Sequence, residues 1–166
     1  MDRRHFLSLA AGVTGAGVLS MAFFGRSSAA EGAAKFEFEL TDAEWRQRLS
    51  PEAYKVLRGH GTERAGTSPL NLEKRPGVFH CAGCDLPLFD AATKYESGTG
   101  WPSFYRPLDN AIGTREDRSF FMVRTEVHCR RCGGHLGHGV DDGPPPPGLR
   151  YCLNGGALAF RPTAGA

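Results

Sequence analysis

Two Cys-x-x-Cys pairs constrain this chain more than any other feature of its sequence. Four of its five cysteines form them, at Cys81 and Cys84 and again at Cys129 and Cys132. Two such turns can present four thiolates to one tetrahedral ion, which is the closed geometry of a structural zinc site. Gly133, directly after the second pair, lets the backbone turn tightly beside the sulfur atoms. A domain that contains both pairs would be held together by the ion.

Two other uses of these cysteines compete with zinc. In an oxidising compartment they could form two disulfides, or one pair could be a redox centre of the thioredoxin type. A redox pair is expected at the start of a helix, and the two glycines that follow Cys132 do not suit a helix. We therefore predict one structural Zn²⁺ held by all four cysteines, as a staple of the fold and not as a reaction centre.

The glycine and proline content restricts the fold class. Of 166 residues, 22 are glycine and 11 are proline. This content argues against a helical bundle and favours short strands joined by loops. Charged residues make up 23% of the chain, an ordinary share for a globular protein, so we do not expect disorder throughout.

The first thirty residues are typical of an export signal. Arg3 and Arg4 precede an uncharged stretch over residues 6–25, and small residues follow up to Ala30. A basic start, an apolar middle and a small-residue exit mark a signal peptide, and the paired arginines resemble a bacterial twin-arginine signal. We predict export of the folded protein to the periplasm by the twin-arginine machinery, with cleavage after Ala30. The alternative is an uncleaved membrane anchor, with the domain facing the periplasm.

We expect the signal over residues 1–30, a linker over 31–39 and one domain over 40–166. The signal contains three arginines and one aspartate, so the rest of the chain has equal numbers of acidic and basic residues. This balance does not suggest the positive surface that phosphate binding requires, and we expect no nucleic-acid partner. Folding before export would take place in the reducing cytoplasm, where cysteines can bind metal before they form disulfides.

The domain is predicted to begin with two short helices. Residues 41–44 match a capping box, and Ser50 before Pro51 marks a second helix start. That helix should end near Arg58, with Gly59 in the left-handed conformation. The segments expected as strands are residues 77–80 and 120–127, and the four-proline run 144–147 is expected to be an exposed loop.

The fifth cysteine, Cys152, is open to two interpretations. Arg150 and Asn154 share its face if the segment is a strand. A neighbouring cation favours the thiolate and so makes a cysteine nucleophilic, whereas a buried thiol without such a neighbour is inert. His135 and His138 could be metal ligands, an acid–base pair or ordinary surface residues. If zinc is held by four cysteines, both histidines are available for proton transfer.

Three segments of the chain resemble one enzyme family. They are Gly98-Thr99-Gly100-Trp101-Pro102-Ser103-Phe104, His135-Leu136-Gly137-His138 and Arg150-Tyr151-Cys152-Leu153-Asn154. With Gly61-Thr62-Glu63 and both cysteine pairs, they resemble the peptide-methionine (R)-S-oxide reductases, the B class of methionine sulfoxide reductases. The resemblance covers about residues 40–160. It implies a mainly β fold, the β-tent, in which two small antiparallel sheets follow short N-terminal helices beside a structural zinc site.

The resemblance also implies roles for the site residues. Cys152 would attack the sulfur of a methionine-R-sulfoxide in an oxidised protein or peptide and become a sulfenic acid. His135 and His138 would supply the proton that the sulfoxide oxygen needs. The other implied roles are hydrogen bonding by Asn154, stabilisation of the thiolate by Arg150, an aromatic wall for the substrate methyl group by Trp101, and orientation of a histidine by Asp142.

The chain departs from the family at the position of the resolving cysteine. Many members carry a cysteine where this sequence has Thr99. With the other four cysteines on zinc, we expect a one-cysteine cycle. An external thiol, either a thioredoxin-like protein or a small thiol, would reduce the sulfenic acid directly. Milder departures that concern the shape of the pocket are Gly66, Asp85 and Gly139-Val140.

Two other functions compete with a reductase. A zinc-stapled binding module would keep the four paired cysteines but would not need Cys152, His138 and Trp101 together. A thiol–disulfide oxidoreductase would use a metal-free Cys-x-x-Cys pair. Replacement of Cys152 by serine tests the first alternative, and metal analysis tests the second.

Overall fold

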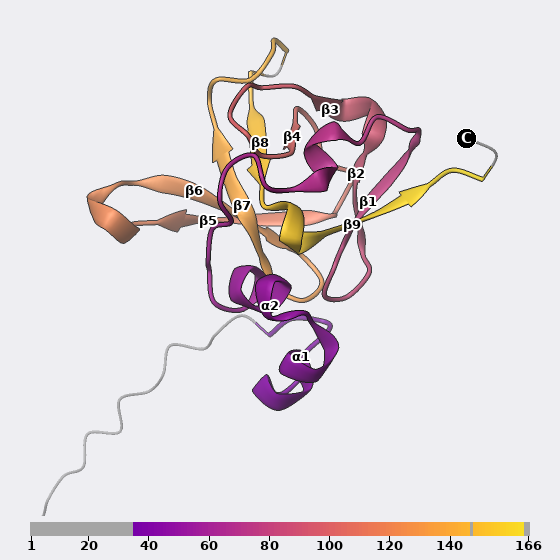
Figure 1. Cartoon of the computed structure of the whole chain (residues 1–166). Helices are drawn as coiled ribbons and strands as arrows, with labels where there is room; N and C mark the ends of the chain where they lie inside the picture. The colour runs from indigo at the N-terminus through magenta and orange to yellow at the C-terminus, as the bar shows by residue number, and fades with distance from the viewer. Residues whose placement is uncertain (1–34, 147, 165–166) are drawn as a thin grey trace, which may run out of the picture. The chain divides into compact units, whose positions relative to one another are not determined.

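Two antiparallel sheets make up most of the computed structural model, which describes residues 35–146 and 148–164 (Figure 1). One sheet has three strands in the order β2-β1-β9, and the other has six in the order β3-β4-β8-β7-β6-β5. The strands are β1 (Gly77–Cys81), β2 (Pro87–Asp90), β3 (Lys94–Tyr95), β4 (Ser103–Phe104), β5 (Ile112–Asp117), β6 (Arg124–Cys129), β7 (His135–Val140), β8 (Arg150–Leu153) and β9 (Leu158–Pro162). This is the predicted mainly β fold of two antiparallel sheets. The predicted signal peptide lies outside the described residues.

Both predicted helix starts are confirmed. The helices are α1 (Asp42–Arg48) and α2 (Pro51–Leu57). At the first, the Thr41 side chain accepts from the backbone N–H of Glu44, while the Glu44 carboxylate accepts from the backbone N–H of Thr41 at 2.8 Å. At the second, the Ser50 hydroxyl accepts from the N–H of Ala53 at 3.1 Å. Each helix begins where a side chain satisfies backbone donors that would otherwise have no partner.

The end of α2 differs from the prediction. His60 takes the left-handed conformation, with φ at 51°, and Gly59 does not. The helix instead closes through the N–H of Gly61, which donates to the Lys55 carbonyl at 2.9 Å. Gly59 is needed for space, because a Cβ there would lie 2.7 Å from the same carbonyl oxygen.

The strand predicted over residues 120–127 begins only at Arg124. Residues Ser119–Phe121 form a 3₁₀ turn at the tip of the β5–β6 hairpin, which extends away from the rest of the domain (Figure 1). The Asp117 carboxylate accepts from the backbone N–H of Ser119 at 2.9 Å, and this local bond favours a turn over an extended chain. Met122 and Val123 are consequently 51% and 67% exposed. The predicted strand over 77–80 is β1, and Pro144 to Pro146 are exposed as expected.

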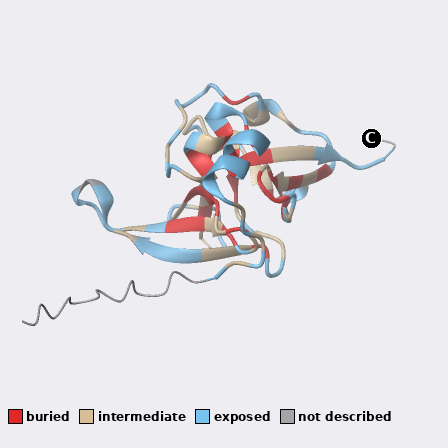
Figure 2. Ribbon diagram, turned by 90° about the horizontal axis from the view of Figure 1, so that it is seen from below, coloured by how far each residue is buried: buried red, intermediate tan, exposed pale blue. Residues whose placement is uncertain are grey.

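Aromatic side chains connect the two sheets. Phe79 and Phe89 from the three-stranded sheet, and Phe104 from β4, are fully buried. The centroid of the Phe104 ring lies 5.0 Å from that of Phe79 and 4.6 Å from that of Phe89. Buried residues gather where the sheets and helices meet, and the hairpin tip is exposed (Figure 2). Contacts of this kind stabilise the junction by about 0.5–1.5 kcal/mol per aromatic pair beyond the burial of area.

The helices pack on the same core through Trp45, Val56 and Leu57, all buried. The end of the predicted linker contacts the domain as well. Phe38 donates its backbone N–H to the Arg131 carbonyl at 2.9 Å, and its ring lies 5.7 Å from that of Trp45. In the part of the chain that the structure describes, no helix has the length and apolar character needed to cross a membrane.

Candidate active site and four-cysteine cluster

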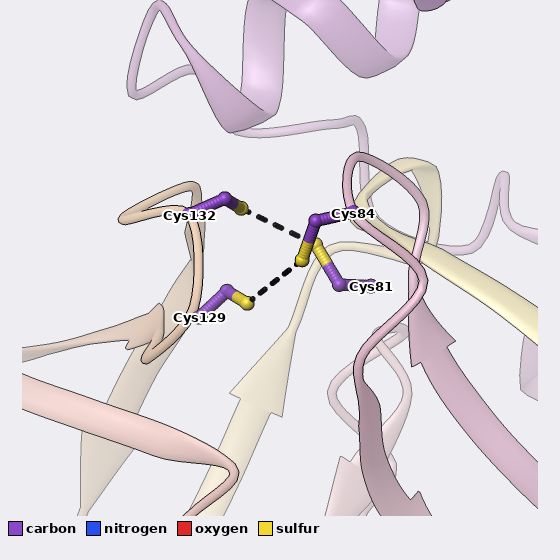
Figure 3. Close-up of side chains that lie close together, drawn as sticks. All are labelled: Cys81, Cys84, Cys129 and Cys132. Carbon is purple, nitrogen blue, oxygen red and sulfur yellow. Dashed lines mark hydrogen bonds between the residues drawn. The ribbon is translucent and has the colours of Figure 1, made fainter. Parts of the chain in front are cut away.

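The four paired cysteines come together at the junction of the two sheets. Cys81 ends β1 and Cys129 ends β6, so each pair belongs to a different sheet (Figure 3). All four are buried, and their sulfur atoms lie within 4.8 Å of one another. The Sγ–Sγ distance is 3.7 Å from Cys81 to Cys132 and 3.5 Å from Cys84 to Cys129. A tetrahedral site with Zn–S bonds of about 2.3 Å requires sulfurs about 3.8 Å apart, whereas a disulfide is about 2.0 Å long, so the cluster has the geometry of a metal site.

The two cysteine turns have the same backbone conformation. The fourth residue after the first cysteine is left-handed in both, with φ at 64° for Asp85 and 68° for Gly133. Its N–H donates to the carbonyl of that first cysteine, at 2.9 Å in each turn. Asp85 adopts this conformation without being glycine, and aspartate tolerates it better than most residues do.

Arginines surround the cluster and donate to the carbonyls of the cysteine turns. Four converging thiolates carry negative charge when they bind a divalent ion, and positive side chains nearby offset it. Two of the arginines come from the ends of α1 and α2, so the helices are joined to the cysteine turns by hydrogen bonds. The bonds run from Arg48 to Gly83 at 2.5 Å, from Arg58 to Cys132 at 3.1 Å and from Arg131 to Cys84 at 3.2 Å.

Cys152 lies in β8, an inner strand of the six-stranded sheet. The residues paired with it in register are His138 on β7 and Ser103 on β4. Directly opposed residues of antiparallel strands present their side chains on one face, so the register puts the His138 imidazole and the Cys152 thiol on the same face of the sheet. Both side chains line a cavity of about 260 Å³. The other predicted site residues that line it are Trp101, Arg150 and Asn154, together with Thr99.

His138 is fixed by a carboxylate that the sequence analysis missed. Its Nε2 lies 2.8 Å from the Asp117 carboxylate. Burial lowers the pKa of His138, and this effect exceeds the opposite effect of the hydrogen bond to Asp117. Asp117 also accepts from Ser119 and Arg124, and these bonds, with the one from His138, hold the pKa of its carboxyl well below the usual value. It thus stays ionised beside His138.

His135 lies behind His138 and does not line the cavity of Cys152. It is 2% exposed, and its ring lies 5.4 Å from that of His138 in an edge-on arrangement. Its Nδ1 is 2.7 Å from the Glu126 carboxylate, which also accepts from Arg115. Burial raises the pKa of Glu126, but these two hydrogen bonds outweigh it and lower that pKa to about 2. The two histidines predicted as one acid apparatus therefore occupy different positions.

The expected role of Asp142 is wrong. Its carboxylate contacts no histidine and instead accepts two hydrogen bonds from Arg150, both at 2.7 Å. The cause is strand register, because Arg150 pairs with Val140 at the end of β7 and Asp142 follows just beyond. Asp117 and Glu126 take the place beside the histidines. One signal for Glu126 was present in the sequence: a carboxylate within a strand that was expected to be apolar needs a partner.

Asn154 and Trp101 hold the backbone of Glu63, which lies beside the cavity. Asn154 Oδ1 accepts from the backbone N–H of Glu63 at 2.9 Å, and its Nδ2 donates to the Leu136 carbonyl at 3.0 Å. Trp101 Nε1 donates to the Glu63 carbonyl at 3.1 Å. The Glu63 carboxylate in turn accepts from the N–H groups of residues 155–156, at 2.6 and 2.9 Å. The Gly-Thr-Glu motif thus fixes the wall of the cavity and the turn after β8.

Thr99, the residue that the family resemblance places at the position of a resolving cysteine, lines the cavity. Its Oγ1 lies 2.8 Å from the Ser97 hydroxyl, which is 2.7 Å from that of Ser103. All the other cysteines are in the four-cysteine cluster. Among the described residues that line this cavity, Cys152 is thus the only one with a thiol.

Comparisons with known proteins agree with this arrangement. The SelR domain matches residues 49–162. A "Peptide methionine sulfoxide reductase MsrB" from Pseudomonas putida is 54% identical over 131 residues, which cover 78% of this chain and 98% of that protein. One from Agrobacterium fabrum is 50% identical over 74% of this chain and 92% of its own length. A chloroplastic peptide methionine sulfoxide reductase from Arabidopsis thaliana is 54% identical over 76% of this chain and 63% of its own length. The chain therefore belongs to the SelR-domain family of B-type peptide methionine sulfoxide reductases, which are oxidoreductases.

Proposed function

We propose that this reductase acts on the R epimer of protein-bound methionine sulfoxide, with Cys152 as nucleophile and His138 as the proton donor. The pairing of Cys152 with His138 across β7 and β8 supports this assignment, since both side chains line one cavity with Trp101. The aromatic face of Trp101 suits the methyl group of the substrate through a sulfur–aromatic contact. Arg150, buried and paired with Asp142, adds positive charge to the same cavity.

In the first half of the cycle, the Cys152 thiolate attacks the sulfoxide sulfur. The sulfur–oxygen bond of the substrate breaks, and the oxygen is transferred to the Cys152 sulfur, which becomes a sulfenic acid. The proton that the thiol loses returns to this oxygen through His138, so atoms and charge balance. The substrate sulfur is reduced to methionine and the Cys152 sulfur is oxidised, each by two electrons.

In the second half, two external thiol groups restore Cys152. One attacks the sulfenic acid and releases water, and the other reduces the mixed disulfide so formed. The two thiols leave as a disulfide, either within a thioredoxin-like protein or between two small thiols. Thr99 at the position of the resolving cysteine supports this route.

We assign Zn²⁺ to the four-cysteine cluster as a structural ion. The converging buried sulfurs support this assignment, and four protein ligands leave no coordination position for substrate. The ion would hold the two cysteine turns together and take no part in the reaction.

We further propose that residues 1–30 direct the folded protein to the periplasm, where it repairs oxidised exported proteins. The paired arginines and the uncharged stretch after them support this proposal. Expression of the full chain in a bacterium with and without the twin-arginine translocase tests it. The periplasmic protein should begin at Glu31 and disappear without the translocase; a protein that keeps Met1 in the membrane would favour the anchor.

Reduction of separate R and S methionine-sulfoxide peptides by the chain from Glu31 tests the reaction. With dithiothreitol, the wild type should reduce the R peptide alone. The Cys152→Ser variant should lose this activity while its zinc content stays at one per chain. A zinc-loaded wild type that is inactive on both peptides would overturn the proposal and favour a binding module.

A further inference from the structure

A second group of metal-binding side chains lies beside the active site. It comprises His60, Glu126 and His135, which we call the two-histidine cluster, and their ligand atoms lie within 4.8 Å of one another. The Glu126 carboxylate oxygen Oε1 is 2.7 Å from His135 Nδ1 and 3.1 Å from His60 Nδ1. The rings of the two histidines are 5.2 Å apart. One carboxylate oxygen therefore faces two imidazole nitrogens.

The cluster draws on three separate parts of the fold. Glu126 lies on β6 and His135 on β7, and both side chains are almost completely buried. His60 belongs to the loop after α2, and its side chain is 54% exposed. The three residues line a cavity of about 530 Å³, which gives an ion a path from solvent and leaves room for water. Two histidines and one glutamate with an open position form the ligand set of several catalytic zinc sites.

The charges around the cluster also allow an ion to bind. Burial lowers the pKa of His60, which favours the neutral imidazole that binds a metal ion through its lone pair. Arg115 donates to both carboxylate oxygens of Glu126: its Nε contacts Oε2, and its second nitrogen lies 3.2 Å from Oε1, the oxygen that faces the histidines. It would orient Glu126 as an outer-shell partner, and its longer bond to Oε1 would give way to the ion. The positive charge of Arg115 opposes a cation, so the ion should bind reversibly and more weakly than at the four-cysteine cluster.

We propose that the two-histidine cluster is a second metal site, which takes a divalent transition-metal ion such as Zn²⁺ and slows the reductase when occupied. The ion would replace the proton on His135 Nδ1 and place positive charge beside the neighbouring His138 ring. A cation there disfavours the protonated imidazole that donates to the sulfoxide oxygen. The slowing of the enzyme rests on the proposed function of His138, but the binding of the ion does not.

Calorimetric titration with Zn²⁺ tests the binding. The protein is the zinc-loaded chain from Glu31 with Cys152→Ser, which removes the active-site thiol as a competing ligand. We expect one further Zn²⁺ per chain, with affinity reduced at least roughly tenfold by an added His60→Ala. Arg118→Gln, at an exposed residue that lines the same cavity without offering a ligand, is the matched control and should bind at least as tightly. No second Zn²⁺, or equal affinity in the His60→Ala protein, would overturn the site.

A single-turnover assay tests the effect on the reductase. Pre-reduced enzyme with an intact Cys152 is mixed with the sulfoxide peptide and Ni²⁺, without added thiol that would chelate the metal. The rate of methionine formation is compared with the same protein's metal-free rate. Ni²⁺ should slow the wild type and have little effect on His60→Ala. Equal slowing of both proteins would overturn the inhibitory role, and an inactive metal-free wild type would count against the proposed function instead.

Discussion

At His138 two influences on the imidazole oppose each other. Burial favours the neutral ring, and the Asp117 carboxylate at 2.8 Å favours the protonated one. The net result is a lowered pKa, so the ring gives up its proton below the usual pH. For the proton donor proposed here, the protonated fraction is largest at acidic pH and falls as pH rises through the pKa of the ring.

Replacement of Asp117 by asparagine should therefore shift the pH profile. Without the negative charge, burial acts unopposed and the pKa of His138 falls further. The alkaline decline of kcat/KM should move to lower pH, and at pH 7 the loss should stay below the ~10²–10⁴-fold that removal of a general acid costs. Asp142→Asn is the matched control, because Asp142 contacts Arg150 and not a histidine. An unchanged alkaline decline in Asp117→Asn would show that His138 is not the donor.

At the scale of single elements, the start of a helix could be predicted where a nearby side chain in the sequence fixes it. The ends of elements could not be predicted where several local hydrogen bonds compete for the same backbone. Thr41 and Ser50 mark helix starts because their partners lie three residues away. The β5–β6 turn replaced the first part of a predicted strand because the Asp117 carboxylate accepts a local hydrogen bond from the backbone N–H of Ser119. His60 took the left-handed position expected at Gly59, since the last backbone bonds of α2 extend past its end.

In the candidate site, too, some residues could be predicted from the sequence and others could not. Cys152, His138, Trp101, Arg150 and Asn154 were identified from motifs, and the fold brings them to one cavity. Their partners could not be read from the sequence, because the pairing of strands decides which carboxylate meets which cation. The pairing of β6 with β7 brings Glu126 to His135, and the pairing of β7 with β8 brings Arg150 to Asp142. No local pattern encodes either contact.

At the scale of the whole molecule, the two sheets are joined in two ways. The buried aromatic contacts of Phe79, Phe89 and Phe104 connect them, and the four-cysteine cluster links the ends of β1 and β6. Structural zinc in small zinc-binding peptides contributes about 10–16 kcal/mol, which is comparable to the whole net stability of a domain, about 5–15 kcal/mol. The cluster should consequently dominate the stability of this fold.

Loss of one cysteine of the cluster should therefore destabilise the domain far more than loss of the Cys152 thiol. We expect Cys132→Ser to abolish stoichiometric zinc and lower the melting temperature by at least about 10 °C, which corresponds to a few kcal/mol in a domain of this size. Cys152→Ser makes the same chemical change outside the cluster, so it should keep its zinc and melt within a few degrees of wild type. Zinc analysis with calorimetry measures both quantities. A zinc-free Cys132→Ser protein that melts like wild type would mean that the aromatic contacts alone hold the two sheets together.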